Sequence, residues 1–142
     1  MEIVRFKKEH FSNLMLQDMQ VAMGPILADP AYGEALEQQP IAFTAIEGDK
    51  VYACGGLVEE WQGVARAWML ITGEMDGKFL HVHRAVKSGL DKYRGFHRIE
   101  MSVAKGFTEG CRWAEMLGFK YEGIARKYTA GGHDCHKYAR VT

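Results

Sequence analysis

The sequence contains few cysteines and no excess charge of either sign. Its three cysteines, Cys54, Cys111 and Cys135, are too few and too odd in number for a disulfide framework, so we expect a reducing compartment. Lysine plus arginine equals aspartate plus glutamate, at 18 each. Because duplex binding needs a basic surface that displaces counterions, this balance argues against a nucleic-acid partner.

Long apolar runs are also missing. No stretch approaches the roughly 20 apolar residues that span a bilayer, and the opening "MEIVRFKKEHF" lacks the apolar core of a signal peptide. We therefore expect a soluble cytoplasmic protein with no membrane partner. The 142 residues, 47% of them hydrophobic, are enough to close one core, and we expect a single domain over 1–142.

The spacing of apolar residues alternates between the strand period of two and the helix period near 3.6. It predicts strands and helices in this order: strand 2–7, helix 9–23, helix 30–38, two strands within 41–61 around Gly48-Asp49, strand 63–72, helix 78–94, strand 97–104, helix 108–117, and strands within 119–129 and 135–141. The strand–helix–strand passage from 64 to 104 predicts one right-handed parallel crossover. We expect an α+β domain with a mixed, mostly antiparallel sheet and helices on both faces.

The segment "RWAEMLGFKYEGIARKY" contains a helix-to-strand corner. Gly118 can take the left-handed conformation that ends a helix, and Phe119 then enters the core beside Leu117. The corner explains how the chain folds at this point, and by itself it carries no chemistry.

The element order and this corner resemble the GNAT superfamily of acyl-CoA-dependent N-acetyltransferases. The matching residues are the Leu117-Gly118-Phe119 corner and the later Glu122-Gly123, Arg126 and Tyr128. The topology covers nearly the whole chain, and the sequence pattern covers its last third. The resemblance implies acetyl-CoA as cofactor and a small-molecule or protein amine as acceptor. It also implies that pantetheine pairs with the backbone of four strand residues: Trp68, Met69, Leu70 and Ile71.

The phosphate-binding loop departs from the family pattern. The corresponding stretch, "ITGEMDGKFL", retains Gly73 and Gly77, but at a different spacing. Glu74 and Asp76 would repel phosphate, which Lys78 would partly offset. We take Gly73, Gly77 and Lys78 as the candidate cofactor residues of this loop.

The family's proton donor is missing as well. Many members carry a tyrosine four residues before the corner glycine, and this position is Ala114. Similar departures occur in GNAT-like proteins encoded by tailed bacteriophages, some associated with virion assembly. This resemblance implies an alternative function, a catalytically degenerate protein with a structural, assembly or regulatory role in the host cytoplasm or the virion.

Four residues are candidates for the chemistry. Glu59 or Glu60, at a strand end, could accept the proton of the amine, and only one of them can point into a cleft because neighbours on a strand face opposite ways. Ser102 could donate to a thiolate or carbonyl, and Tyr121, or alternatively Tyr128, could act as the acid. Each also has a simpler interpretation as a surface or packing residue.

The segment "GGHDCH" places His133, Asp134, Cys135 and His136 together, but its spacing matches no closed zinc pattern. We expect no metal site. Cys111 lies in an apolar helix stripe and is interpreted as a small core residue. Pairing of terminal strands across a two-fold axis would allow a homodimer.

Overall fold

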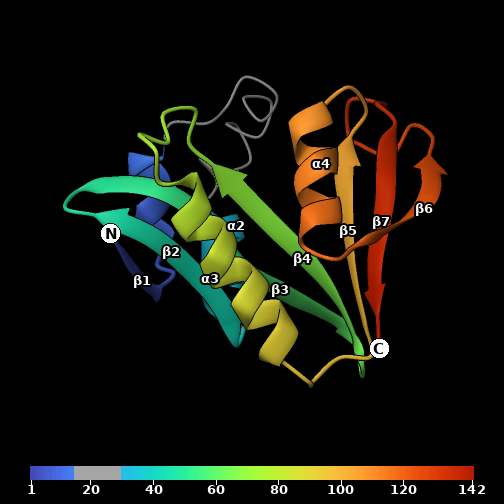
Figure 1. Ribbon diagram of the computed structural model, residues 1–142, viewed down its shortest axis with the longest axis horizontal. Coiled ribbons are helices and arrows are strands. Elements are labelled where there is room, and N and C mark those ends of the chain that lie inside the picture. Colours follow the sequence, from blue (N-terminus) through green and yellow to red (C-terminus); the bar gives the residue numbers. More distant parts are fainter. Residues whose placement is uncertain (15–29) are drawn as a thin grey trace. The chain divides into compact units, whose positions relative to one another are not determined.

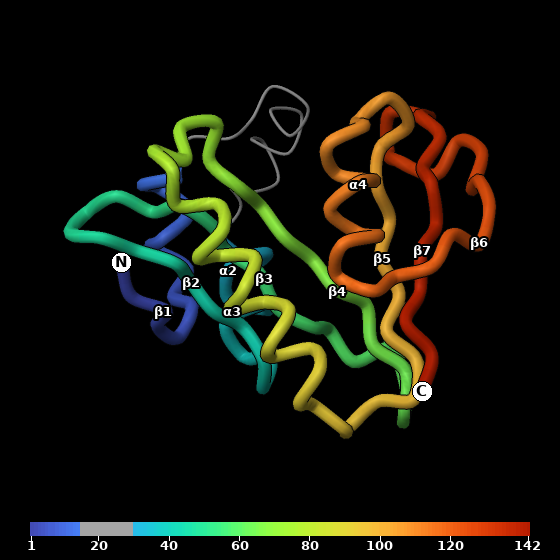
Figure 2. The backbone as a smooth tube through the Cα atoms, viewed as in Figure 1, coloured from blue at the N-terminus to red at the C-terminus, as the bar shows by residue number. Residues whose placement is uncertain are grey.

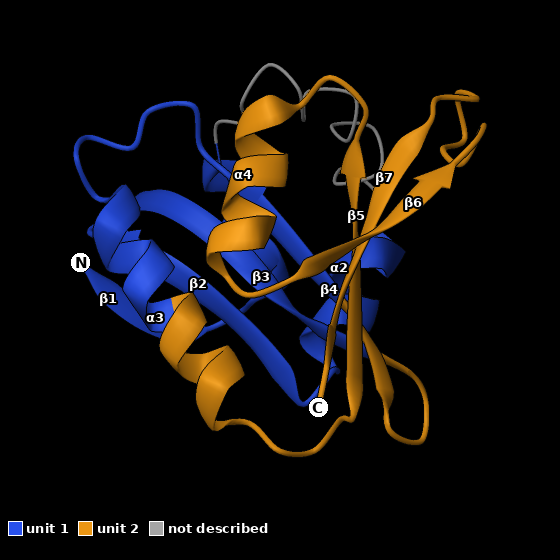
Figure 3. Cartoon of the chain, turned by 45° about the vertical axis from the view of Figure 1, so that its right-hand side comes forward, with its two compact units in different colours: residues 1–58, 67–85 blue, residues 59–66, 86–142 orange. Residues whose placement is uncertain are grey.

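The computed structural model describes residues 1–14 and 30–142 (Figure 1). The elements along the chain are β1 (Glu2–Arg5), a 3-10 helix η1 (Lys8–Asn13), α2 (Pro30–Glu37), β2 (Ile41–Glu47), β3 (Lys50–Trp61), β4 (Val64–Ile71), α3 (Phe79–Lys92), β5 (Arg98–Ala104), α4 (Thr108–Met116), β6 (Lys120–Ala125) and β7 (Cys135–Val141). The strands follow the order β1-β2-β3-β4-β5-β7-β6 in a seven-stranded sheet. The chain divides into two compact units, Met1–Val58 with Ala67–Ala85 and Glu59–Arg66 with Val86–Thr142 (Figure 3).

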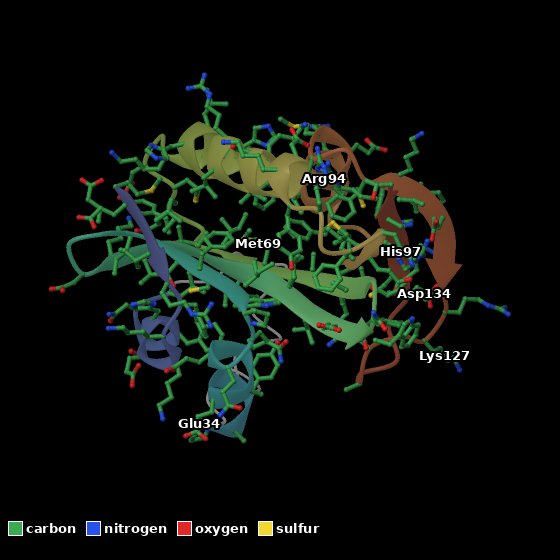
Figure 4. All side chains as sticks on the ribbon, turned by 90° about the horizontal axis from the view of Figure 1, so that it is seen from below. Glu34, Met69, Arg94, His97, Lys127 and Asp134 are labelled. Carbon is green, nitrogen blue, oxygen red and sulfur yellow. The ribbon has the colours of Figure 1, made fainter. Side chains whose placement is uncertain are left out.

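Unit 1 is built on the β2–β3 hairpin, whose turn has Gly48 at a φ of +61°. β1 pairs antiparallel with β2, so Ile3 lies opposite Ala45. η1 and α2 lie on one face of these strands, and α3 begins on the other (Figure 4). The core on the η1 side contains seven buried residues: Phe6, Phe11, Leu36, Ala42, Val51, Cys54 and Leu70.

A buried polar chain crosses this core. The Thr44 hydroxyl lies 2.7 Å from Nδ1 of His10 and 3.7 Å from the Cys54 sulfur. The backbone N–H of Lys7 also donates to His10 Nδ1, so this nitrogen is the acceptor and the imidazole proton resides on Nε2. Burial raises the pKa of the Cys54 thiol to about 12, which makes it an inert core group rather than a nucleophile.

Gly56 is required by a close approach of two strands. A Cβ at this position would lie 2.3 Å from the carbonyl oxygen of Ile41 on β2. The two strands can therefore pair at this point only if the residue is glycine, because the obstructing atom belongs to the backbone and cannot move aside as a flexible side chain can.

Unit 2 contains a strand inserted out of sequence order. β7 lies between β5 and β6 and pairs antiparallel with both (Figure 2). The start of β4 pairs in parallel with β5, Val64 to Arg66 opposite Arg98 to Glu100. α4 contacts β5 and β6, and its buried residues Trp113 and Ala114 face the core of this unit.

The corner after α4 has the conformation that the sequence predicts. Gly118 has a φ of +90°, and Leu117 and Phe119 are 4% and 3% exposed. Arg140 on β7 donates to the Leu117 carbonyl at 2.7 Å and pairs with Asp91 at the end of α3 at 2.8 Å. These bonds satisfy one of the carbonyls that a helix C-terminus leaves unpaired.

The α+β class, with a mixed and mostly antiparallel sheet, is confirmed. An α-helix was predicted over 9–23. The described part of this range forms the short 3-10 helix η1 instead, and residues 15–23 lie outside the described residues. β6 ends at Ala125 rather than near Thr129, because a turn at Arg126 and Lys127 leaves the ladder. None of the described helices is both long and apolar enough to cross a membrane.

Replacing Gly118 by alanine should lower the free energy of unfolding by about 1–2 kcal/mol, because a Cβ disfavours its positive φ. Gly89→Ala is the matched control, since that glycine lies inside α3 with open space around its Cβ position and alanine there should raise stability by about 0.5–1 kcal/mol. Urea unfolding of the two variants measures both effects. Equal changes in the two variants would contradict this account of the corner.

Candidate functional site

The candidate cofactor residues lie in unit 1, on β4 and in the loop that follows it. Leu70 and Ile71 are buried, whereas Trp68 and Met69 are half-buried. The Trp68 ring packs edge-on against Phe6, with centroids 5.5 Å apart. Its indole Nε1 is buried and has no hydrogen-bond partner in the described part of the chain. A buried donor without an acceptor costs about 1–3 kcal/mol, so an acceptor supplied by a ligand would relieve it.

The loop between β4 and α3 is a tight turn. Thr72 fixes its start, with its N–H donating to the Tyr52 carbonyl and its Oγ1 accepting from the N–H of Glu74 at 3.2 Å. Asp76 and Gly77 follow with φ of +52° and +75°. The chain then enters α3, whose first N–H groups have no carbonyl one turn before them within the helix.

The acidic side chains of this loop are partly compensated by a residue from another strand. Lys50, at the start of β3, lies 2.5 Å from Oδ2 of Asp76 and 3.5 Å from Oε2 of Glu74. The hydrogen bond from Lys50 holds the pKa of the Asp76 carboxyl below its usual value. Lys78, predicted to offset these charges, lies 3.3 Å from Glu47, and its positive charge also helps to lower the pKa of the Asp76 carboxyl. Sequence reasoning missed Lys50, because only the fold brings it to a loop more than twenty positions away.

The candidate catalytic residues belong to unit 2, where strand alternation sorts them onto two faces. Ser102 and Lys137 are directly opposite one another on β5 and β7, and their side chains share one face. Tyr121 and Tyr138, also opposite one another, belong to the face covered by α4, since Tyr138 interacts with Cys111. The structure therefore separates Ser102 from Tyr121.

Ser102, Lys137 and Tyr128 form a hydrogen-bonded group, which we call the Tyr128 trio. Lys137 Nζ lies 2.8 Å from Ser102 Oγ and 3.4 Å from the phenol oxygen of Tyr128. The same ammonium lies 4.5 Å from the centre of the Tyr128 ring. The hydrogen bond from Ser102 is the largest cause of a lowered pKa of the Tyr128 phenol, and Lys137 and Arg66 act in the same direction.

The loop between β6 and β7 holds Tyr128 in place. The N–H groups of Tyr128 and Thr129 both donate to the His133 carbonyl, at 2.8 and 3.2 Å. The Lys127 N–H donates to Oδ1 of Asp134 at 2.9 Å, and the two residues are neighbours in Figure 4. These hydrogen bonds fix the backbone of the loop and so hold the exposed Tyr128 side chain at one position on it.

Of the two predicted glutamates, Glu60 joins the face of the Tyr128 trio. Its Oε1 lies 2.7 Å from Arg66 on β4, and Arg66 pairs in register with Glu100 on β5. Residues 100 and 102 share a face, so Glu60 is connected to the side of the sheet that bears Ser102. Glu59, its neighbour on β3, faces the other way.

Tyr121 has different surroundings from Tyr128 although the two are similarly exposed, at 51% and 47%. Its hydroxyl lies 3.2 Å from Nδ1 of His136, and its ring contacts that of Tyr138 edge-on. His136 and Asp134 of the "GGHDCH" segment thus have separate partners, and Cys135 is buried.

The position of the family tyrosine is filled by core packing. Ala114 is fully buried, and its carbonyl accepts the Phe119 N–H at 3.0 Å. No side chain at this position can donate a proton.

Several solved structures with the same fold are acetyltransferases. An acetyltransferase of the GNAT family from Bacillus anthracis superposes with a TM-score of 0.71 at 17% identity, covering 98% of this chain and 93% of that one. A variant of spermidine N-acetyltransferase SpeG from Vibrio cholerae gives 0.68 at 15%, covering 99% and 95%. A ribosomal-protein-S5-alanine acetyltransferase from Vibrio fischeri gives 0.65 at 17%, covering 98% and 91%.

No protein-family model matches the chain, and no curated protein matches it in sequence. At such low identities the similarity establishes the fold, which is that of GNAT acetyltransferases. Activity must be argued from the site, because one fold supports different functions.

Arg98 on β5 lies on the face of the Tyr128 trio and connects β5 to β6 through ion pairs, which makes stability depend on pH. It donates to Glu100 at 2.8 Å and bonds both carboxylate oxygens of Glu122, a residue in the β-bulge of β6. The hydrogen bonds from Arg98 hold the pKa of the Glu122 carboxyl below its usual value. Because the pKa of Glu122 is lower in the folded than in the unfolded protein, the stabilisation is fully present above the unfolded pKa and is lost as pH falls through the folded pKa.

Glu122→Gln should therefore make unfolding stability less dependent on pH in the acid range, as measured by urea unfolding at a series of pH values. Arg98→Met should produce the same flattening, because it removes the other partner. If each variant loses stability in parallel with the wild type down to the acid limit, the bond does not shift the Glu122 carboxyl.

Proposed function

We propose that the protein transfers an acetyl group from acetyl-CoA to an amine. The observation that carries the proposal is the buried indole N–H of Trp68, which has no hydrogen-bond partner among residues 1–14 and 30–142, on β4, the strand to which the resemblance assigns the cofactor. The GNAT fold supports it, since each of the three solved acetyltransferases covers over 90% of the length of both chains.

The residues of unit 1 fit acetyl-CoA. The described pairs between β4 and β5 end at Arg66, and pantetheine would extend along the next residues, Trp68 to Ile71, as an added strand. The diphosphate would lie at the N-terminus of α3, where backbone N–H groups favour anions. Gly77 has open space at its Cβ position, and no acidic residue lies in the first turn of α3.

Lys50 makes this loop compatible with phosphate. Without it, Glu74 and Asp76 would add two uncompensated negative charges beside the diphosphate. With Lys50 present, one of the two negative charges is offset, and Lys78, whose charge also acts on Asp76, and the helix N-terminus reduce the repulsion further. When bound, acetyl-CoA supplies an acyl group already activated as a thioester.

The amine acceptor must lose a proton, and Glu60 is the better placed of the two glutamates. Arg66 binds its Oε1 and fixes the side chain, which leaves Oε2 to accept a proton. Glu59 points away from this face. The acceptor itself is a small molecule or a protein amine. Both kinds occur among the structures of similar fold, since one is a spermidine N-acetyltransferase and another is a ribosomal-protein-S5-alanine acetyltransferase.

The alternative is a protein of this fold that has lost catalysis and acts in assembly or regulation, as the resemblance to phage-encoded proteins implies. Ala114 at the tyrosine position favours it, as does the engagement of Lys78 with Glu47. The two functions differ in one respect that can be measured directly, which is affinity for acetyl-CoA.

Calorimetric titration of the protein with acetyl-CoA tests the proposal. We expect micromolar binding accompanied by a rise in Tm, because a ligand that binds only the folded state stabilises it. Absence of heat at high ligand concentration, together with an unchanged Tm, would exclude the acetyltransferase function and leave the alternative.

Lys50→Met should weaken acetyl-CoA binding by about fivefold at low salt, since it exposes the diphosphate to the carboxylates of Glu74 and Asp76. Glu74→Gln should strengthen binding for the same reason. Lys92→Met, at the C-terminal end of α3, removes one positive charge far along the helix from the loop and serves as the control. Equal affinities of the Lys50 and Lys92 variants at low salt would show that the ion pairs of this loop do not govern binding.

A further inference from the structure

The polar chain in the core of unit 1 includes a group that can gain a proton near neutral pH, the imidazole of His10 on η1. η1 lies between two points where the chain is held by strands. The N–H of Phe6 donates to the Ala42 carbonyl at 3.1 Å, and Leu14 forms a parallel bridge with Val51. Protonation of His10 therefore acts on a short segment that is fixed at both ends.

Each hydrogen of the polar chain has one assignment while the ring is neutral. Nδ1 of His10 accepts from the backbone N–H of Lys7 at 3.1 Å, so it carries no proton of its own. Thr44 must then donate its hydroxyl hydrogen to the same nitrogen, at 2.7 Å. Because that hydrogen is used, the Thr44 oxygen accepts from the Cys54 thiol, 3.7 Å away. Thr44 and Cys54 are both fully buried, so water does not reach this part of the chain.

A proton on Nδ1 breaks this arrangement. The Lys7 N–H would then face another N–H, and a backbone amide cannot act as an acceptor through its nitrogen. Thr44 could accept from the protonated ring only by turning its own hydrogen towards Cys54, which leaves the buried thiol hydrogen without its acceptor. The protonated ring thus loses hydrogen bonds that the neutral ring makes, in a place where water cannot replace them.

From this accounting we propose that His10 is a pH-sensitive switch, whose neutral ring holds η1 on the β2–β3 hairpin and whose protonation releases η1. Phe11 of η1 is 8% exposed, and its ring packs against that of Trp68 with centroids 6.3 Å apart. Release of η1 withdraws this aromatic neighbour from Trp68 on β4. The switch acts in the free protein and does not depend on the proposed function, although it alters the strand to which the cofactor is assigned.

The charged groups that face His10 come from the two ends of η1 and from α2. Lys7 disfavours the imidazolium, whereas Glu9 on η1 and Glu37 on α2 favour it. β2 contributes the neutral hydroxyl of the polar chain, and β3 contributes the neutral thiol of Cys54. Burial has the largest effect, and it places the pKa of the His10 imidazole below its usual value.

Acid should favour the released state. The pKa of His10 is lower with η1 in place than after release, where it returns to about 6.5. The stabilisation of η1 is therefore fully present above about pH 6.5 and is lost as pH falls through the lower, folded pKa. Release takes up one proton, so the equilibrium between held and released η1 shifts by at most about tenfold per pH unit in this window.

An NMR titration of the isotope-labelled imidazole rings tests the assignment in the wild type. Among the six histidines, we expect one that carries its neutral proton on Nε2 and has a pKa below about 6.5. Its signals should disappear in His10→Asn. A pKa of the His10 imidazole at or above 6.5, or a neutral proton on Nδ1, would overturn the switch.

Amide hydrogen exchange tests the release itself. His10→Asn keeps a side-chain acceptor for the Lys7 N–H and does not titrate, and His81→Asn, at an exposed position on α3, is the matched control. In the wild type and His81→Asn, protection of the residue-10 and Leu14 amides should fall by up to about tenfold per pH unit below about pH 6.5. In His10→Asn it should stay constant. The amides of the β2–β3 hairpin should be better protected throughout, because release of η1 leaves the hairpin paired.

The outcomes decide for or against the switch in each case. Protection of η1 that does not change with pH in the wild type, or that changes equally in His10→Asn, contradicts it. Equal protection of η1 and the hairpin also contradicts it, because η1 would then open only when the unit unfolds. If His10→Asn does not fold, the ring titration and the wild-type exchange still give the answer. None of these results depends on acetyl-CoA, so failure of the switch and failure of the proposed function are distinguishable.

Discussion

β5 and β7 pair antiparallel from Arg98 opposite Val141 to Ala104 opposite Cys135. This ladder requires β7 to enter between β5 and β6, and it fixes which side chains meet. A shift of one residue would move Lys137 to the face of α4 and bring Tyr138 to Ser102. The chemistry that unit 2 can perform therefore depends on this register, which is held at one end by Arg140 and at the other by the bonds of the β6–β7 loop.

Unit 1 depends on charge compensation rather than on register. The loop before α3 carries two carboxylates where the GNAT resemblance implies a phosphate cradle, and Lys50 binds both of them. The ion pairs are solvent-exposed and contribute little to stability. Their effect is on the local field at a helix N-terminus, and that field determines whether an anion is attracted or repelled. The sequence places two carboxylates in this loop, and the fold offsets one of their two charges with Lys50.

The sequence was sufficient for the elements whose signals are local. The corner at Gly118 and the turn at Gly48 were predicted, because a glycine between two segments of regular hydrophobic period indicates a turn. Both glycines have positive φ in the structure. Ser102 was identified as a candidate, but its partner Lys137 lies 35 positions away, and only the strand order brings them together. Tyr121 and Tyr128 could not be ranked from sequence, since both are tyrosines after the same corner and differ only in which face they occupy. Lys50 was missed for the same reason, a tertiary contact with no local pattern.

Hydrogen–deuterium exchange with and without acetyl-CoA tests the central claim most directly, because it locates the ligand by residue. We expect slower exchange in peptides that cover Trp68 to Ile71 and in those that cover the loop and the first turn of α3 up to Val82, since these backbone groups would hold pantetheine and diphosphate. Unchanged exchange in both peptides at saturating ligand would contradict it.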